Sequence, residues 1–273
     1  MTLTLTTQSA ASNLGTPLRG RFMLLPEVRS GGMGEVQKAL DLQTSQFVAV
    51  KRMKLSGDQL RSKASFEREV EALEHLDHPN IVKSILVDQD ESGRWFLAME
   101  WIERNLETYI LEKGHMNWAR FAEEIGDPLL RAIEYAQVSR NLVHRDLNPR
   151  NILVTDAGVP KITDYGISKV LDDRNAWMPV AGRTFVDART AGFSPKEADD
   201  RVHSRRRDCF SFAAIGVFCL VGRRINGDDD LFVAMQEAPL PDGVRPVIER
   251  ALSDDPMQRP VDARALRMDV DFH

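Results

Sequence analysis

The sequence is poor in cysteine, has no long apolar run and carries no excess of basic residues. Its 273 residues include two cysteines, Cys209 and Cys219, whose spacing fits no metal-ligand pattern and which cannot form a disulfide framework. We interpret them as buried thiols in a reducing compartment. The most apolar stretch, 209–222, is about 14 residues long and too short to cross a bilayer, so it predicts a buried core helix. A net charge of −5 argues against a nucleic-acid binder.

Local composition gives further exclusions. The basic cluster 201–207 is most simply a solvated face or loop. The N-terminus lacks a basic region followed by an apolar core, so it does not resemble a secretory signal. We therefore expect a cytoplasmic protein with no membrane segment in this chain.

Apolar patterning divides the chain into three parts. Residues 1–20 are mostly polar and predict a disordered leader. Residues 21–103 are mainly strand-like, with one helix indicated by apolar residues at helical spacing from Phe66 to Leu76. From 104 to 273 helical patterns dominate, which together gives an α+β fold with a small strand-rich lobe and a larger helical lobe. Residues 167–200 show no clean period, and loops of this length are usually functional or disordered.

A short polar run, His144–Asn151, lies between hydrophobic runs and holds Asp146 five residues before Asn151. A second carboxylate, Asp164, follows just before Tyr165. This pattern suits chemistry on phosphate, because one carboxylate can handle a hydroxyl proton while an amide and a second carboxylate hold magnesium.

Two features nearer the N-terminus suit an anionic ligand. The glycine-rich stretch Val28–Val36 lies between two predicted strands, and glycines allow backbone N–H groups to approach phosphate oxygens; a plain turn is the alternative. Lys51 ends an apolar strand, where its ammonium needs an anion. Glu69 on the following helix is a candidate partner, although each residue taken alone is compatible with an ordinary surface position.

In this order and spacing the motifs resemble the eukaryotic-like protein kinase family, and Ser30–Val36 looks like the corresponding turn of bacterial serine/threonine kinases. The resemblance covers about residues 21–268. It implies the two-lobed kinase fold, with a five-stranded antiparallel sheet and one main helix in the small lobe. It also implies transfer of the γ-phosphoryl of ATP, with Mg²⁺, to Ser or Thr hydroxyls of a protein substrate, and autophosphorylation of the activation loop.

The resemblance implies roles for individual residues. Lys51 would contact the α and β phosphates and pair with Glu69, and Asp146 would accept the proton of the substrate hydroxyl or orient that hydroxyl. Asn151 and Asp164 would hold magnesium. An internal spine would stack Leu73, Tyr165 and His144, anchored by Asp208. The remaining nucleotide contacts would come from Val28, Gly31, Gly34, Val36, Ala49, Met99, Glu100, Ile102 and Leu153.

The segment Thr190–Glu197 is similar to the end of a kinase activation loop. The resemblance implies an ion pair between Glu197 and Arg259, and a hydrogen bond between Thr190 and the catalytic Asp146. Arg145 marks the class whose loop is often ordered by phosphorylation. Thr184 is the preferred phosphosite, and Thr190 and Ser168 are weaker candidates.

Three departures from the family pattern stand out. Arg29 replaces the first loop glycine, and Tyr165 replaces a phenylalanine. Asn148 replaces a lysine whose charge neutralises the transferring phosphate, and loss of such a donor typically costs about 10²–10³ in rate. Arg150 is a candidate source of that charge.

These departures keep alternatives open. One is a pseudokinase, a nucleotide-binding scaffold with little catalysis because of Asn148. Another is a small-molecule kinase of the same fold, against which Thr190–Glu197 argues. Dimerisation for trans-autophosphorylation is also open. The chain ends soon after Arg259, where the family has its last helix, so this helix or further domains could be missing.

Overall fold

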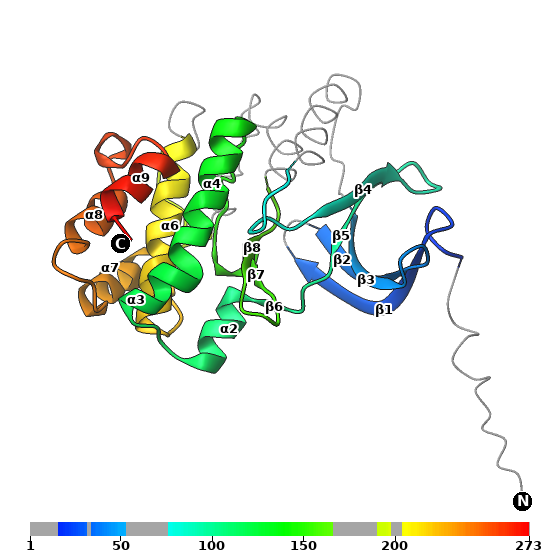
Figure 1. The fold of residues 1–273 in the computed structure, drawn as a ribbon, viewed down its shortest axis with the longest axis horizontal. Helices are drawn as coiled ribbons and strands as arrows, with labels where there is room; N and C mark the ends of the chain where they lie inside the picture. The colour runs from blue at the N-terminus through cyan, green and yellow to red at the C-terminus, as the bar shows by residue number, and fades with distance from the viewer. Residues whose placement is uncertain (1–15, 32–33, 53–75, 166–189, 198–203, 273) are drawn as a thin grey trace, which may run out of the picture. The chain divides into compact units, whose positions relative to one another are not determined.

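The computed structural model describes residues 16–31, 34–52, 76–165, 190–197 and 204–272. They form two compact units: the N-terminal unit comprises the described parts of Met1–Gly57 and Ser84–Trp101, and the C-terminal unit those of Asp58–Lys83 and Ile102–His273 (Figure 1). The division falls between Trp101 and Ile102, beside Glu100 and Ile102, which are predicted to contact nucleotide. The domain boundary expected between residues 103 and 104 stays a prediction.

The N-terminal unit is one antiparallel sheet of five strands, which confirms the sheet that the family resemblance implies. Its strands follow the order β1-β2-β3-β5-β4. The apolar core on one face contains Phe22, Val48, Val50, Phe96 and Ala98. Because side chains alternate along a strand, this pattern leaves every second residue for the opposite face. The bounds are β1 Phe22–Gly31, β2 Gly34–Asp41, β3 Gln46–Arg52, β4 Ser84–Gln89 and β5 Trp95–Glu100.

The end of the expected disordered leader is ordered, which corrects that prediction for residues 16–20. Leu18 is buried with the sheet core and exchanges two backbone hydrogen bonds with Phe22. Leu18 adds one apolar side chain to the core that contains Phe22. A single apolar residue does not change the average polarity of the stretch, so the sequence did not reveal it. Residues 1–15 lie outside the described residues, as does the expected helix around 66–76.

A partly buried ion pair ties the start of the N-terminal unit to the turn after β2. Arg21 donates to both carboxylate oxygens of Asp41, at 2.9 and 2.8 Å, and the Asp41 side chain is buried. Gln43 and Thr44 also donate to this carboxylate. The hydrogen bonds from Arg21 are the main reason that the pKa of Asp41 falls to about 2.

This pKa predicts how the stability of the N-terminal unit depends on pH. The folded pKa of Asp41 is lowered, so its stabilisation of about 2 kcal/mol is present above about pH 4 and is lost as pH falls towards about 2. We expect Asp41→Asn to reduce the free energy of unfolding at pH 7, measured by urea denaturation. The difference from the parent should shrink near pH 3; a difference that stays constant with pH would contradict this assignment.

The C-terminal unit is mainly helical and holds a small antiparallel sheet of order β6-β7-β8. Helix α6 is buried on all sides, which confirms the core helix predicted over 209–222, and burial raises the pKa of both cysteine thiols. Among the described residues, no helix combines the length and apolarity that a membrane crossing needs. The bounds are β6 Arg104–Asn105, α2 Leu106–Lys113, α3 Trp118–Phe121, a π-helical turn Ala122–Gly126, α4 Asp127–Ser139, β7 Ile152–Val154, β8 Pro160–Ile162, α6 Ser204–Val221, α7 Asp228–Glu237, α8 Arg245–Ala251 and α9 Ala263–Val270.

A helix, α9, follows Arg259. Asp262 caps α9 by accepting a hydrogen bond from the backbone N–H of Ala265. The helix packs against α4, and Arg267 forms an ion pair with Glu134 at 2.9 Å (Figure 1). Ala263, Leu266 and Val270 are its buried residues.

Candidate active site

One face of the N-terminal sheet carries four of the residues predicted to contact nucleotide. Val36 lies opposite Lys51, and Ala49 lies opposite Met99. Residues directly opposite each other in antiparallel strands share a face, and this face is the one turned away from the core. Lys51 is buried there with only 6% of its surface exposed.

The glycine stretch forms the β1–β2 hairpin. Gly31 pairs with Gly34 across the turn, and Arg29 pairs with Val36 further along the ladder. The replacement of the first glycine by Arg29 is therefore accommodated as a regular strand position. The tip at residues 32–33 and the predicted partner of Lys51, Glu69, lie outside the described residues.

In the C-terminal unit, the carboxylate of Asp208 holds the start of the motif His144–Asn151. It accepts hydrogen bonds from the backbone N–H of His144 at 3.0 Å and of Arg145 at 2.9 Å, and from the side-chain amide of Gln137 at 3.2 Å. Asp208 is buried at 1% exposure. Arg145 has φ of 68°, a left-handed conformation that is costly for a side chain of this size. The Asp208 carboxylate therefore stabilises a strained backbone just before Asp146.

Asp146 is surrounded by donors from the same unit. Asn151 donates to its main-chain oxygen at 2.8 Å and to its carboxylate at 3.3 Å. The hydroxyl of Thr190 donates to the other carboxylate oxygen at 3.1 Å, which confirms the predicted hydrogen bond between these residues. Asp146 is itself buried. Its carboxylate is thus held in one orientation by groups 5 and 44 residues away.

The side chain of Asn148 has a structural task. Its oxygen accepts from the backbone N–H of Arg150 at 3.0 Å, and its amide donates to the main-chain oxygen of Asp146, also at 3.0 Å. Arg150 forms an ion pair with Glu107 on helix α2, at 3.4 Å. Asn148 and Arg150 both have partners nearby, and the partner of Arg150 is the carboxylate of Glu107 rather than that of Asp146.

The two predicted magnesium ligands flank the same end of the β7–β8 hairpin. The carbonyl of Asn151, just before β7, accepts from the backbone N–H of Thr163, just after β8, at 2.9 Å. Asp164 follows with φ of 63°, another left-handed residue. The amide nitrogen of Asn151 is used on Asp146, so its side-chain oxygen is the atom available to a cation. One amide oxygen and one carboxylate fit Mg²⁺, which is usually bound by few protein oxygens together with substrate phosphates.

Two members of the predicted spine are in contact. The rings of His144 and Tyr165 lie 4.9 Å apart, and His144 Nε2 lies 2.8 Å from the carbonyl oxygen of Thr163. Since that oxygen only accepts, Nε2 carries the proton. Burial raises the pKa of Tyr165 well above its usual value, and among the described residues its hydroxyl has no partner. Leu73 lies outside the described residues.

The segment Thr190–Glu197 is held at its far end as well. Arg259 donates to both carboxylate oxygens of Glu197, at 2.6 and 3.0 Å, which confirms the predicted ion pair. Arg207, on α6, donates to the main-chain oxygen of Glu197 at 2.8 Å. Sequence reasoning missed Arg207, because it treated the basic cluster 201–207 as a solvated face. That interpretation is wrong for Arg205, Arg206 and Arg207, each of which donates to a backbone carbonyl.

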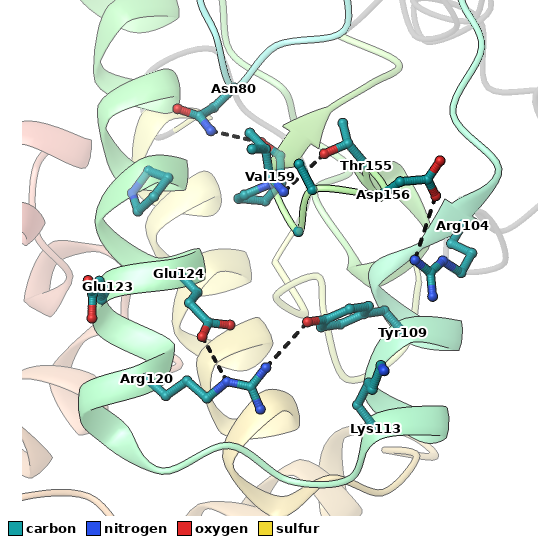
Figure 2. Close-up of a pocket in the computed structure, with 14 residues that line it drawn as sticks. Asn80, Arg104, Tyr109, Lys113, Arg120, Glu123, Glu124, Thr155, Asp156 and Val159 are labelled. Carbon is teal, nitrogen blue, oxygen red and sulfur yellow. Dashed lines mark hydrogen bonds and ion pairs between the residues drawn. The ribbon is translucent and has the colours of Figure 1, made fainter.

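A separate polar cavity of about 610 Å³ lies in the C-terminal unit, among α2, the π-helical turn and the β7–β8 turn (Figure 2). Arg120 pairs with Glu124 at 2.9 Å, and Arg104 lies 3.8 Å from Asp156. Most of the charged side chains that line the cavity are therefore paired with an opposite charge in the same cavity. Asp146, Asn151 and Asp164 do not line it.

A comparison with known protein families identifies the family of this chain. The family described as Protein kinase domain matches residues 22–267, so the chain belongs to the protein kinase family. This agrees with the two-lobed class of fold, an antiparallel five-stranded sheet and a helical lobe.

Among the similar proteins are two bacterial serine/threonine-protein kinases and a kinase domain of known structure. The chain is 33% identical to the serine/threonine-protein kinase PknA of Mycobacterium tuberculosis over 90% of its own length and 59% of PknA. It is 27% identical to PrkC of Bacillus subtilis, covering 94% of this chain and 41% of PrkC. The chain thus spans about half the length of these relatives. Its fold is similar to the crystal structure of a point mutant of the M. tuberculosis PknI kinase domain, with a TM-score of 0.69 at 18% identity, over 94% of this chain and 96% of that chain.

Proposed function

We propose that this chain is the catalytic domain of a serine/threonine protein kinase that transfers the γ-phosphoryl of ATP to hydroxyls of a protein substrate. The hydrogen bond from Thr190 to Asp146 carries the proposal. It joins the segment Thr190–Glu197, which is similar to a peptide-docking loop, to the carboxylate that would receive a hydroxyl proton. The names of PknA and PrkC as serine/threonine kinases support the same residue class.

The roles follow from the chemistry of the side chains. Asp146, oriented by Asn151 and Thr190, would accept the proton of the substrate hydroxyl or align that hydroxyl for attack. Lys51 would bind the α and β phosphates. Asn151 and Asp164 would hold Mg²⁺, which supplies charge neutralisation at the phosphates when bound. Most of the acceleration would then come from positioning and electrostatics.

Asn148 limits the rate in this proposal. Its amide is engaged with Asp146 and Arg150, and it brings no positive charge. We propose an enzyme slower than one with lysine at this position, by up to about 10²–10³. The comparisons give no support to the pseudokinase alternative. The docking segment Thr190–Glu197 favours a protein substrate over a small molecule.

Several finer points remain part of the proposal. They are a cytoplasmic location, a protein substrate and no nucleic-acid partner, dimerisation for trans-autophosphorylation, and Thr184 as the main phosphosite with Thr190 as a second. Thr184 lies outside the described residues. Thr190 is a weaker acceptor, because its hydroxyl is engaged by Asp146.

A direct test is incubation of the purified protein with labelled ATP and Mg²⁺, followed by mass spectrometry of the products. We expect phosphate on Ser or Thr, first on Thr184, and none when EDTA removes the metal. A Thr184→Ala variant should lose the main phosphopeptide. Absence of transfer under both Mg²⁺ and Mn²⁺ would overturn the proposed function.

A further inference from the structure

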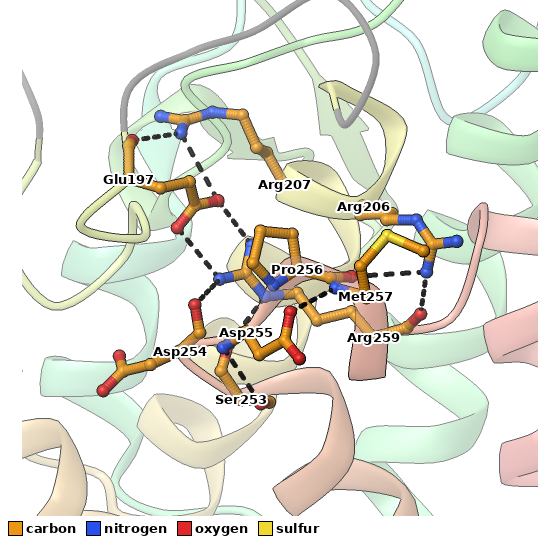
Figure 3. A network of polar contacts seen from close by, with 9 residues as sticks. All are labelled: Glu197, Arg206, Arg207, Ser253, Asp254, Asp255, Pro256, Met257 and Arg259. Atoms are coloured by element: carbon orange, nitrogen blue, oxygen red, sulfur yellow. Dashed lines mark hydrogen bonds and ion pairs between the residues drawn. The ribbon is translucent and has the colours of Figure 1, made fainter.

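Three consecutive arginines at the start of α6 contact three different parts of the C-terminal unit. Arg205 donates to the carbonyl oxygen of Gln137 at 3.2 Å and to the side chain of Asn141 at 2.7 Å. Arg206 donates to the carbonyl oxygens of Pro256 and Arg259. Arg207 instead reaches Glu197 (Figure 3). The arginines therefore have separable roles, and of the three it is Arg207 that bonds to the docking segment.

Arg207 and Arg259 bind different atoms of Glu197. Arg259 takes the carboxylate through two nitrogens, at 2.6 and 3.0 Å. Arg207 takes the main-chain oxygen at 2.8 Å and lies 3.6 Å from the nearer carboxylate oxygen (Figure 3). The Arg207 side chain is 5% exposed, so this charged hydrogen bond is shielded from water. Arg207 therefore fixes the backbone of the segment independently of its acidic side chain.

The segment Thr190–Glu197 connects the carbonyl that Arg207 holds to the Thr190 hydroxyl that contacts Asp146. Its backbone turns at Thr190, whose carbonyl oxygen accepts from the N–H groups of Phe193 and Ser194, both at 3.0 Å. Phe193 and Ser194 are buried, and Pro195 follows with a restricted φ. Only a short, packed stretch thus separates the carbonyl held by Arg207 from the hydroxyl that contacts Asp146.

We propose that Arg207 is a positioning residue for phosphorylation of protein substrates. By holding the main-chain oxygen of Glu197 it fixes the docking segment Thr190–Glu197 and keeps Thr190 against Asp146. Arg207 acts through the segment and touches neither nucleotide nor substrate. The inference rests on the proposed function and assigns it a further residue.

Kinetics of Arg207→Met provide the first test. We expect kcat/KM for a peptide substrate to fall about 10- to 100-fold, the range for loss of one charged hydrogen bond, while KM for ATP changes less than about twofold. Arg207→Lys should recover part of the loss. Arg205→Met is the matched control, because it removes a neighbouring arginine that bonds elsewhere, and it should leave kcat/KM for the peptide nearly unchanged.

The background variant Glu197→Gln separates the two ways in which Arg207 could act. If Arg207 works through the main-chain oxygen, Arg207→Met should cost about as much in Glu197→Gln as in the parent. A cost that disappears in that background would mean that Arg207 acts only through the ion pair, and would overturn the proposal.

Hydrogen exchange gives a readout that needs no kinase activity. The amides of Phe193 and Ser194 should exchange faster in Arg207→Met, and in Arg207→Lys to a smaller extent, than in the parent or in Arg205→Met. If the parent protein transfers no phosphoryl group, the proposed function is refuted. The exchange result would then test only whether Arg207 holds the segment in place. Unchanged exchange in a folded Arg207→Lys and Arg207→Met pair would overturn the positioning role. If Arg207→Met fails to fold, Arg207→Lys takes its place in both tests, alone and in the Glu197→Gln background.

Discussion

Asp146→Asn is expected to lower kcat for phosphoryl transfer by about 10²–10⁴, the usual contribution of a positioned acid or base. The substitution keeps the size of the side chain and one oxygen that can accept from Thr190. It removes the negative charge and places an N–H₂ group where Asn151 already donates, 3.3 Å away. The hydroxyl of the substrate then loses its proton acceptor while the surrounding fold is preserved.

The measurement is kcat with a peptide substrate at saturating ATP, with nucleotide affinity determined separately by calorimetry. Affinity for ATP should change little, because the lost group acts on the hydroxyl. Asp156→Asn is the matched control, since Asp156 is fully exposed in the β7–β8 turn and its ion pair with Arg104 is long. Retention of more than about a tenth of parental activity in Asp146→Asn would assign the proton acceptor to another group.

Asp208→Ala is expected to reduce the free energy of unfolding by about 3–5 kcal/mol. The buried carboxylate accepts from two backbone N–H groups and from the amide of Gln137. Each donor left without an acceptor in a buried site costs about 1–3 kcal/mol. The strained φ of Arg145 would also lose its restraint. A loss of this size is a large part of the stability of a typical domain.

Urea denaturation of Asp208→Ala measures this change. Asp242→Ala, at an exposed loop position, serves as the control and should stay within about 0.5 kcal/mol of the parent. Activity should fall together with stability, since Asp208 anchors the backbone just before Asp146. A loss below about 1 kcal/mol would show that the three donors find other acceptors.

The sequence predicted those parts of the fold and site that depend on local pattern or ordered motifs. A short apolar run gave the strand that leads to Lys51, and a longer apolar run gave α6. The resemblance gave the pairing of Thr190 with Asp146 and of Glu197 with Arg259. Each of these signals is carried by residue types at fixed spacing.

The parts that could not be predicted depend on where side chains end in three dimensions. Arg205, Arg206 and Arg207 have partners between 10 and 68 residues away, and a cluster of arginines gives no indication of them. The direction of Arg150 was open for the same reason, because Glu107 lies on a different helix. Leu18 was missed because a single apolar residue in a polar stretch produces no period.

The burial of α6 has a consequence for biosynthesis. Helices α3 and α4 precede α6 in the chain, whereas α7, α8 and α9, which also pack against it, follow. During translation α6, which is mostly apolar from Cys209 onward, therefore emerges before α7, α8 and α9 have been made to cover it. Incompletely synthesised chains that stop before α8 should expose this surface and associate with chaperones or aggregate. The ribosome-bound intermediate, more than the finished domain, is where this protein is most vulnerable to misfolding.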